Sequence, residues 1–387
     1  MSAGVDMKNV LCRFAVDLYE KLAKKDGAHL NNIFLSPLSI YTAIAMTMAG
    51  SDGNTKQEIL RTLHLSDLTA TGEQHEHIHA IIHKYFETPT GVELSLANRL
   101  FVLQPAKIEA EYSQILQKSY RADTELLTSM PDVESKRKHM NNWVAVNTRD
   151  KIKNLIPPGC VSGNTVLALI NALYFKGKWH TKFLENRTYP KEFHCSDGKT
   201  VEVEMMYVKA GFPYISWDVC DARAIRLPFK DSDWHMLIVL PKEKDGLSKV
   251  VDHLRKPGNL EALLKADFSK LEIAVHLPKF KLSEGDPLDA KELLIQCGIH
   301  DLFDCAKANL SKMSTNGQLS VSSVLHKCVL EVDEEGATAV AATGAVANCI
   351  ADRRHPTFVA DHPFFISLVC DTMVPVFVGH VAKPENP

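Results

Sequence analysis

Residues 165–179 read TVLALINALYFKGKW, an apolar run that Asn171 alone interrupts between Val166 and Phe175. A strand with one face in water alternates polar and apolar side chains, and this run does not. We therefore predict a central β-strand that is covered on both faces. The remaining elements must be arranged around it.

Helical patterns precede this strand, and strand patterns follow it. Apolar residues recur at helical spacing in PLSIYTAIAMTMAG (37–50), NTKQEILRTLHL (54–65) and VESKRKHMNNWVAVNTRDKI (133–152). Further strands are expected in HMLIVLPK (235–242), LEIAVHLPKFKL (271–282) and FFISLVCDTMVPVFVGHV (364–381), the last with a turn near Asp371 and Thr372. Helices first and strands later predict an α+β fold.

The composition is that of a globular protein without a strong charge bias. Of the 387 residues, 45% are hydrophobic and 24% are charged, and 44 Lys and Arg against 47 Asp and Glu give a net charge of −3. Binding that depends on phosphate neutralisation needs a basic excess, so we expect no nucleic-acid partner. Since no low-complexity linker, charge block or repeat interrupts the chain, we predict one domain over residues 1–387.

The cysteines and the amino terminus indicate where the protein is found. The nine cysteines are odd in number and lack CxxC spacing, which argues against a disulfide or zinc framework and favours a reducing compartment. Residues 1–27 lack the pattern of a signal peptide, and no apolar run approaches the ~18 residues of a membrane span. We expect a cytoplasmic protein without membrane contact, with release or secretion left open.

Three separated stretches resemble signatures of the serpins, the serine protease inhibitor family. They are NNIFLSPLSIYTAIAMTMAGSDGNTKQEIL (31–60), LINALYFKGKWHTKF (169–183) and FVADHPFFISLVCDTMVPVFVGHVAKP (358–384), with shorter matches at 94–102, 203–208, 227–241 and 275–284. The chain is most similar to the intracellular ovalbumin-like type. The resemblance implies a monomer with three β-sheets, eight or nine helices and an exposed reactive-centre loop at about 336–358.

The resemblance also assigns roles to polar residues around the main sheet. It places a shutter network, which lets two strands part, at Ser36, Ser39, Asn171 and His326. It places Trp179 at the breach, where the loop enters, and pairs Glu334 with Lys279 there. Without the resemblance, these residues would be a satisfied buried cluster, a core aromatic and a solvated charge.

The segment EEGATAVAATGAVANCIADRRHPTF (334–358) carries neither charge nor proline from Gly336 to Ala351. A surface helix or flexible loop is the simplest interpretation, but exposed uncharged segments invite aggregation and have no solubility advantage. Serpin loop insertion is a known case of strand addition to a sheet, and it requires such a composition. The resemblance makes the hinge Glu334, Glu335, Gly336, Ala337, Thr338, Ala339, Val340, Ala341, Ala342 and Thr343.

The side chains of this segment fit insertion. With a period of two, Ala337, Ala339, Ala341, Thr343, Ala345 and Ala347 share one face, and all six are small. Two positions depart from the family pattern. Ala337 stands where Thr or Ser is usual, and Gly344 weakens the strand by roughly 0.5–1 kcal/mol relative to alanine.

The resemblance implies a metastable suicide substrate that forms a covalent acyl-enzyme with a serine protease and contributes no catalytic group itself. The family's spacing from Gly336 places the reactive bond between Ile350 and Ala351, which suits elastase-like or chymotrypsin-like pockets. Cleavage at Arg353 or Arg354, by a trypsin-like protease, is the alternative. Cleavage there would leave extra residues between the inserted strand and the attached protease, which would weaken the distortion of the protease.

Other functions remain as alternatives. A non-inhibitory serpin, such as a carrier, chaperone or storage protein, usually has bulky or charged hinge residues, which this hinge lacks. A hydrolase would need a nucleophile motif such as GxSxG, and we find none, so we expect no enzyme.

Further motifs carry weaker signals. His75, His79 and His83 recur at four-residue steps and could bind zinc, but a solvated face is the simpler interpretation, so no metal or other cofactor is predicted. The KRKH cluster at 136–139 is too short for a heparin site. Asn186 and Asn309 begin glycosylation sequons, which matter only in a secreted protein.

Overall fold

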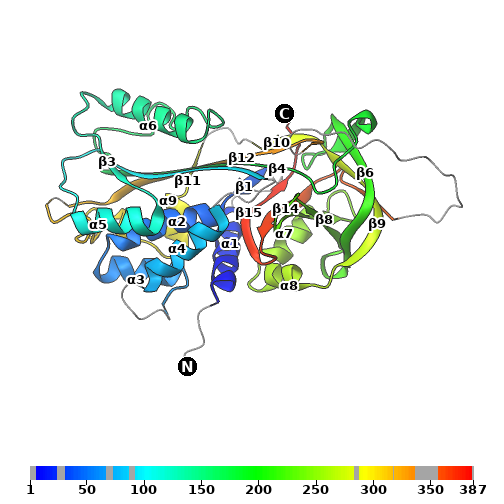
Figure 1. The fold of residues 1–387 in the computed structure, drawn as a ribbon, viewed down its shortest axis with the longest axis horizontal. Coiled ribbons are helices and arrows are strands. Elements are labelled where there is room, and N and C mark those ends of the chain that lie inside the picture. The colour runs from blue at the N-terminus through cyan, green and yellow to red at the C-terminus, as the bar shows by residue number, and fades with distance from the viewer. Residues whose placement is uncertain are drawn as a thin grey trace, which may run out of the picture.

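The computed structural model describes residues 6–23, 31–66, 73–86, 92–282, 287–316, 318–335 and 356–385. The helices α2 to α6 gather at one end of an elongated molecule, and strands β6 to β9 gather with helices α7 and α8 at the other (Figure 1). The hinge from Gly336 onward and both candidate reactive bonds lie outside the described residues.

A six-stranded sheet, here called the main sheet, crosses the molecule between these ends (Figure 1). Its strand order is β10 (Phe280–Leu282), β12 (Val321–Val332), β4 (Leu167–Gly177), β2 (Val92–Val102) and β3 (Thr124–Leu126), while β11 (Leu288–Asp289) also pairs with β12. The predicted central strand is β4. It pairs antiparallel with β2 and parallel with β12, and we call the boundary between β4 and β12 the seam.

Both faces of β4 are buried, as its unbroken apolar run requires. One row, which includes Leu169 and Leu173, packs into the core that contains α2 (Pro37–Ala49). The alternate row, which includes Ile170 and Tyr174, packs with residues of α6 (Val133–Asn147). Helices therefore lie on both sides of the main sheet, α6 on one face and α2 on the other (Figure 1).

The second sheet has nine strands in the order β1, β15, β14, β8, β7, β6, β9 and β13, with β5 also paired to β6. Their bounds are β1 Ile33–Leu35, β5 Tyr189–His194, β6 Thr200–Trp217, β7 Ala222–Pro228, β8 Trp234–Pro241, β9 Ser269–Pro278, β13 Thr357–Val359, β14 Phe364–Cys370 and β15 Val374–Val381. The resemblance implied three sheets, whereas the described strands form two hydrogen-bonded sheets. The cause is β6, whose 18 residues pair in turn with β5, β9 and β7 and so join two groups of strands.

Nine α-helices lie in the described residues, which agrees with the eight or nine that the resemblance implied. Besides α2 and α6 they are α1 Met7–Ala23, α3 Gly53–Thr62, α4 Glu73–Phe86, α5 Ala110–Ile115, α7 Leu247–Leu254, α8 Asn259–Lys265 and α9 Lys291–Gln296. A π-helical turn, η1 (Leu116–Tyr120), continues α5. Short 3-10 turns are η2 Glu185–Arg187, η3 Asp218–Cys220 and η4 Asp301–Phe303. Within the described ranges, no helix has the length and apolarity needed to cross a membrane.

Several predicted elements differ in detail from the observed ones. The predicted strand at 271–282 is divided at Lys279 into β9 and β10, which belong to different sheets. The turn near Asp371 and Thr372 is present, and both residues have positive φ. The mainly helical first part of the chain also contains β2, whose 11 residues pair along the whole length of β4.

Candidate functional site

The start of α2 brings two buried serines under the seam. Ser36 is the N-cap of this helix with extended backbone angles, and Pro37 follows at the first helical position, where a missing N–H costs nothing. Ser36 Oγ accepts a hydrogen bond from the N–H of Ser39 at 3.2 Å and donates to the carbonyl of Val376 at 2.7 Å. The cap therefore also connects α2 to strand β15.

Two polar residues face each other across the seam above these serines. Asn171 of β4 and His326 of β12 are register partners. The side-chain oxygen of Asn171, Oδ1, contacts His326 Nδ1. The Asn171 amide donates to Ser39 Oγ at 2.5 Å and to the side chain of Asn98 on β2. Ser36, Ser39, Asn171 and His326, all buried, thus form one network that joins β4, β12 and α2, and Asn98 extends it to β2.

The hydrogen bonds define the tautomer of His326. Its Nε2 lies 3.1 Å from the backbone N–H of Ser36 and must accept, so the proton is on Nδ1 and is donated to Asn171. Complete burial lowers the pKa of His326 to about 3. A second proton on Nε2 would face the Ser36 N–H, so the network requires neutral histidine.

The structure predicts a loss of stability in mild acid. Burial lowers the pKa of His326 and of His235 to about 3 and that of His380 to about 4, and Arg226 adds to the effect at His235. These folded pKa values lie below the unfolded value of about 6.5, so stability is complete above pH ~6.5 and falls as the pH drops toward 3. Each histidine should contribute a slope that approaches about 1.4 kcal/mol per pH unit to the free energy of unfolding near pH 5.

Denaturant unfolding of His326→Gln at several pH values tests this expectation, because the variant should lose one such contribution to the slope. His180→Gln is the control, since it makes the same substitution at an exposed position. An equal slope in His326→Gln and the parent protein would show that His326 is not held neutral.

The end of the seam next to the loop has a second set of contacts. Trp179 donates from Nε1 to the carbonyl of Asp333 at 2.8 Å and stacks on Phe229, with ring centroids 4.8 Å apart. Glu334 is only 8% exposed, so it is not the solvated charge expected without the resemblance. Its carboxylate lies 3.1 Å from Lys279 Nζ and accepts from Thr188 Oγ1 at 2.8 Å.

Glu334 keeps its charge in spite of its burial. Desolvation by itself raises the pKa of this carboxyl, but the hydrogen bonds from Thr188 and Lys279 outweigh it, so the pKa lies below its ordinary value. The backbone carbonyl of Glu334 also accepts from the N–H of Phe183 at 3.2 Å. The residue just before the loop is therefore anchored by both its side chain and its backbone.

Sequence reasoning missed two residue pairs at the seam and one further member of the polar network. Tyr174 donates to Glu331 at 2.9 Å, Lys176 Nζ lies 2.6 Å from Asp333, and Asn98 belongs to the network around Asn171. A signal for the first two was present, because Tyr174 and Lys176, like Glu331 and Asp333, are two residues apart and so project from the same face of a strand.

The structure does not describe most of the remaining predicted residues. Glu335 ends a described segment, whereas Gly336 to Thr343, Ile350, Ala351, Arg353 and Arg354 fall outside the described residues. Among the residues with described positions, no group of three or more His, Cys, Asp or Glu side chains could hold a metal ion. Asn186 is exposed on η2, while Asn309 is half-buried beside α3.

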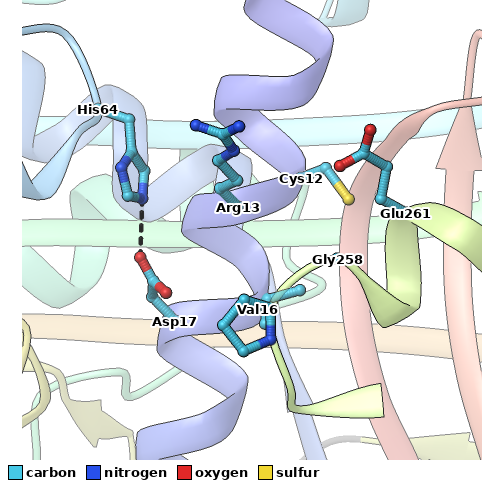
Figure 2. A pocket seen from close by; sticks show the side chains of 8 residues that line it. Cys12, Arg13, Val16, Asp17, His64, Gly258 and Glu261 are labelled. Atoms are coloured by element: carbon cyan, nitrogen blue, oxygen red, sulfur yellow. Dashed lines mark hydrogen bonds and ion pairs between the residues drawn. The ribbon is translucent and has the colours of Figure 1, made fainter.

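A separate pocket of about 440 Å³ lies between α1 and the start of α8. Figure 2 shows Cys12 and Arg13 on α1, Glu261 opposite, and the 2.8 Å contact between Asp17 and His64. Burial raises the pKa of Cys12 to about 12, so its thiol remains protonated and is not a nucleophile. None of its lining residues belongs to the seam.

The fold and site define a class: an α+β protein whose main sheet has a central parallel seam and a buried polar network beneath it. The family described as "Serpin (serine protease inhibitor)" matches residues 9–384, and the chain belongs to this family. The description of the family is that of protease inhibitors and not of enzymes.

Similar proteins cover nearly the whole chain. "Iris" of Ixodes ricinus is 35% identical over 97% of this chain and 99% of its own length. The leukocyte elastase inhibitor of Sus scrofa is 35% identical over 96% and 98%. The crystal structure of Serpin48 of Tenebrio molitor superimposes with a TM-score of 0.86 at 28% identity, covering both chains completely.

Proposed function

We propose that this protein is a monomeric, single-domain suicide inhibitor of serine proteases, whose loop inserts into the seam after cleavage. The observation that carries the proposal is the position of the seam. Strand β12, which forms one side of it, ends at Val332 and leads within a few residues into the uncharged segment from Gly336. The seam is therefore the neighbouring site for a strand formed by that segment.

Strand directions support insertion at the seam. β12 and β4 are parallel, and a segment that turns back after β12 runs antiparallel to both. Insertion would replace one parallel pair with two antiparallel pairs, which are slightly more stable per residue. The parallel pairing of β12 with β4 extends from Val321 and Leu167 to Leu330 and Phe175, so the seam is long enough for most of the segment before Ile350.

The seam is closed by contacts that can be replaced. His326 with Asn171 and Tyr174 with Glu331 join β4 to β12, and Lys176 joins β4 to Asp333, the residue that follows β12. Separating the strands breaks polar contacts whose groups can find other partners, whereas the apolar cores on the two faces of the sheet persist. The small side chains of the loop then fill the space without introducing a buried charge.

The reaction begins as ordinary proteolysis. The serine of the protease attacks the carbonyl of Ile350, the peptide bond to Ala351 breaks, and the amine of Ala351 leaves after taking a proton from the histidine of the protease. The front part of the loop, joined to the protease by an ester, inserts and carries the protease along the main sheet. Distortion of the protease then prevents water from hydrolysing the ester.

The partner is a protease of elastase-like or chymotrypsin-like specificity, with a trypsin-like enzyme acting at Arg353 or Arg354 as the alternative. A curated relative carries the name leukocyte elastase inhibitor, which supports the first choice. The mechanism needs no cofactor. No disulfide joins the cysteines of the described residues, in keeping with a cytoplasmic location.

Incubation with pancreatic elastase, chymotrypsin and trypsin tests the proposal. We expect an SDS-stable complex with elastase or chymotrypsin, and a released fragment that begins at Ala351. Ile350→Arg should transfer complex formation to trypsin, whereas the control Arg353→Ala/Arg354→Ala should leave the elastase or chymotrypsin complex unchanged. Cleavage of the loop by all three enzymes without any complex would identify a substrate and not an inhibitor.

A further inference from the structure

Two adjoining cavities lie between α4 and α5, away from the seam. The larger, of about 600 Å³, is lined by residues of α4, α5 and η1. The smaller, of about 310 Å³, extends toward α3 and the end of α2. Both are lined by His75, Glu111 and Ile115, so they form one groove, here called the α4–α5 groove. A groove of this volume is within the range of small-molecule sites.

The charges along this groove are unbalanced. Lys56 and Lys312 line the smaller cavity and Lys118 lines the larger one, and none of the three ammonium groups forms an ion pair with a described residue. Among the residues whose side chains the structure describes, two carboxylates, Glu76 and Glu111, line the groove against these three lysines. The smaller cavity has two ammonium groups and a single carboxylate, so it favours an anion.

His75 lines both cavities, and the positive charge of Lys56 affects its pKa. His75 Nδ1 lies 2.8 Å from the hydroxyl of Tyr120, which is buried and un-ionised. Burial and the charge of Lys56 together lower the pKa of His75 below its ordinary value. A bound anion near Lys56 would offset this repulsion. On the larger cavity, His79 Nδ1 is buried without a hydrogen-bond partner among the described residues.

The walls of the groove combine apolar surface with distorted backbone. Ile115 lies where the cavities meet, and the buried ring of Tyr112 and the methyl group of Ala49 line the smaller one. The helix that carries Lys118 and Ser119 is π-helical over Leu116–Tyr120, a distortion that often marks a functional site. It ends at Arg121, which has a φ of 47°.

From this arrangement we propose that the α4–α5 groove binds a small amphipathic anion, an alkyl or aryl carboxylate, with its head near Lys56 and Lys312 and its apolar part along Ile115. The position of the groove gives such a ligand a means to affect the main sheet. Helix α4 precedes β2, and η1 precedes β3, the two strands on the β4 side of the seam. An effect on loop insertion rests on the proposed function, whereas binding itself does not.

Calorimetric titration of the intact protein with decanoate, decylammonium and decanol tests the inference, because the three probes share a tail and differ in head-group charge. We expect decanoate to bind at least tenfold more tightly than the other two. Lys56→Gln/Lys312→Gln should weaken decanoate binding at least tenfold, while the exposed, distant Lys249→Gln should change it less than twofold. Decanoate should also raise the pKa of His75, followed by NMR.

Equal binding of the three probes, or decanoate binding that the double variant leaves unchanged, would overturn the proposal. Unchanged melting temperatures of the variants exclude a folding defect. The two proposals fail separately: a protein that traps a protease without binding decanoate loses only this inference, and one that binds decanoate without trapping loses only the proposed mechanism.

Discussion

Cutting the loop between residues 336 and 355 should raise the melting temperature of the protein by on the order of 20 °C. The inserted segment would form backbone hydrogen bonds with both β4 and β12, each with a net value of about 1 kcal/mol, for a total on the order of 10 kcal/mol. For a large domain, each kcal/mol corresponds to about 2 °C or more. The intact chain is therefore expected to be trapped kinetically above its most stable form.

Limited digestion with thermolysin, a metalloprotease that forms no acyl-enzyme, provides the cut protein without a trapped complex. Mass spectrometry locates the cut, and calorimetry compares the cut and intact forms. The control is Ala339→Arg cut in the same way, which should gain much less because its loop cannot insert fully. A cut parent protein that melts no higher than the intact one would refute insertion, and with it the proposed mechanism.

Ala339→Arg should convert the inhibitor into a substrate, with a loss of at least tenfold in the fraction of cleavage events that end in a stable complex. In an extended hinge with a period of two, Ala339 would share a face with small side chains only. Insertion would place the arginine within the main sheet without an acidic partner, at a cost of several kcal/mol. Insertion would then stop early, and water would hydrolyse the acyl-enzyme.

The measurement is the molar ratio of inhibitor to protease needed for complete inhibition, together with the amounts of complex and cleaved chain on denaturing gels. Ala306→Arg makes the same substitution at an exposed turn and should behave as the parent. Ala339→Ser keeps a small side chain and should also trap. If Ala339→Arg traps as efficiently as these controls, the hinge does not insert in the way proposed.

Local patterns in the sequence were sufficient for many elements. The apolar run at 165–179 predicted β4 because only a strand covered on both faces tolerates such a run. The patterns at 37–50 and 133–152 predicted α2 and α6 with their correct first residues. The helices end at Ala49 and Asn147, before the ends of the predicted segments. The interruption at Lys279 was not predicted, because a change of sheet depends on what lies alongside the strand and not on its own residues.

The candidate site also contains residues that were predicted and contacts that were not. Ser36, Ser39, Asn171 and His326 were grouped by resemblance, and no spacing rule would have joined residues that are up to 290 positions apart. The contacts of Tyr174 with Glu331 and of Lys176 with Asp333 were missed because the parallel register of β4 and β12 was unknown. A shift of one residue would send each of these side chains to the opposite face.

The amino-acid sequence by itself determined that the segments 37–50, 54–65 and 133–152 form helices, which strand is covered on both faces, and that residues 336–351 carry no charge, because these properties depend on neighbours along the chain. Only the tertiary structure decided which strands border the seam, which polar groups close it, and that Glu334 is buried against Lys279 and Thr188. These features depend on register and packing between distant segments, where a displacement of a few ångströms replaces one partner with another.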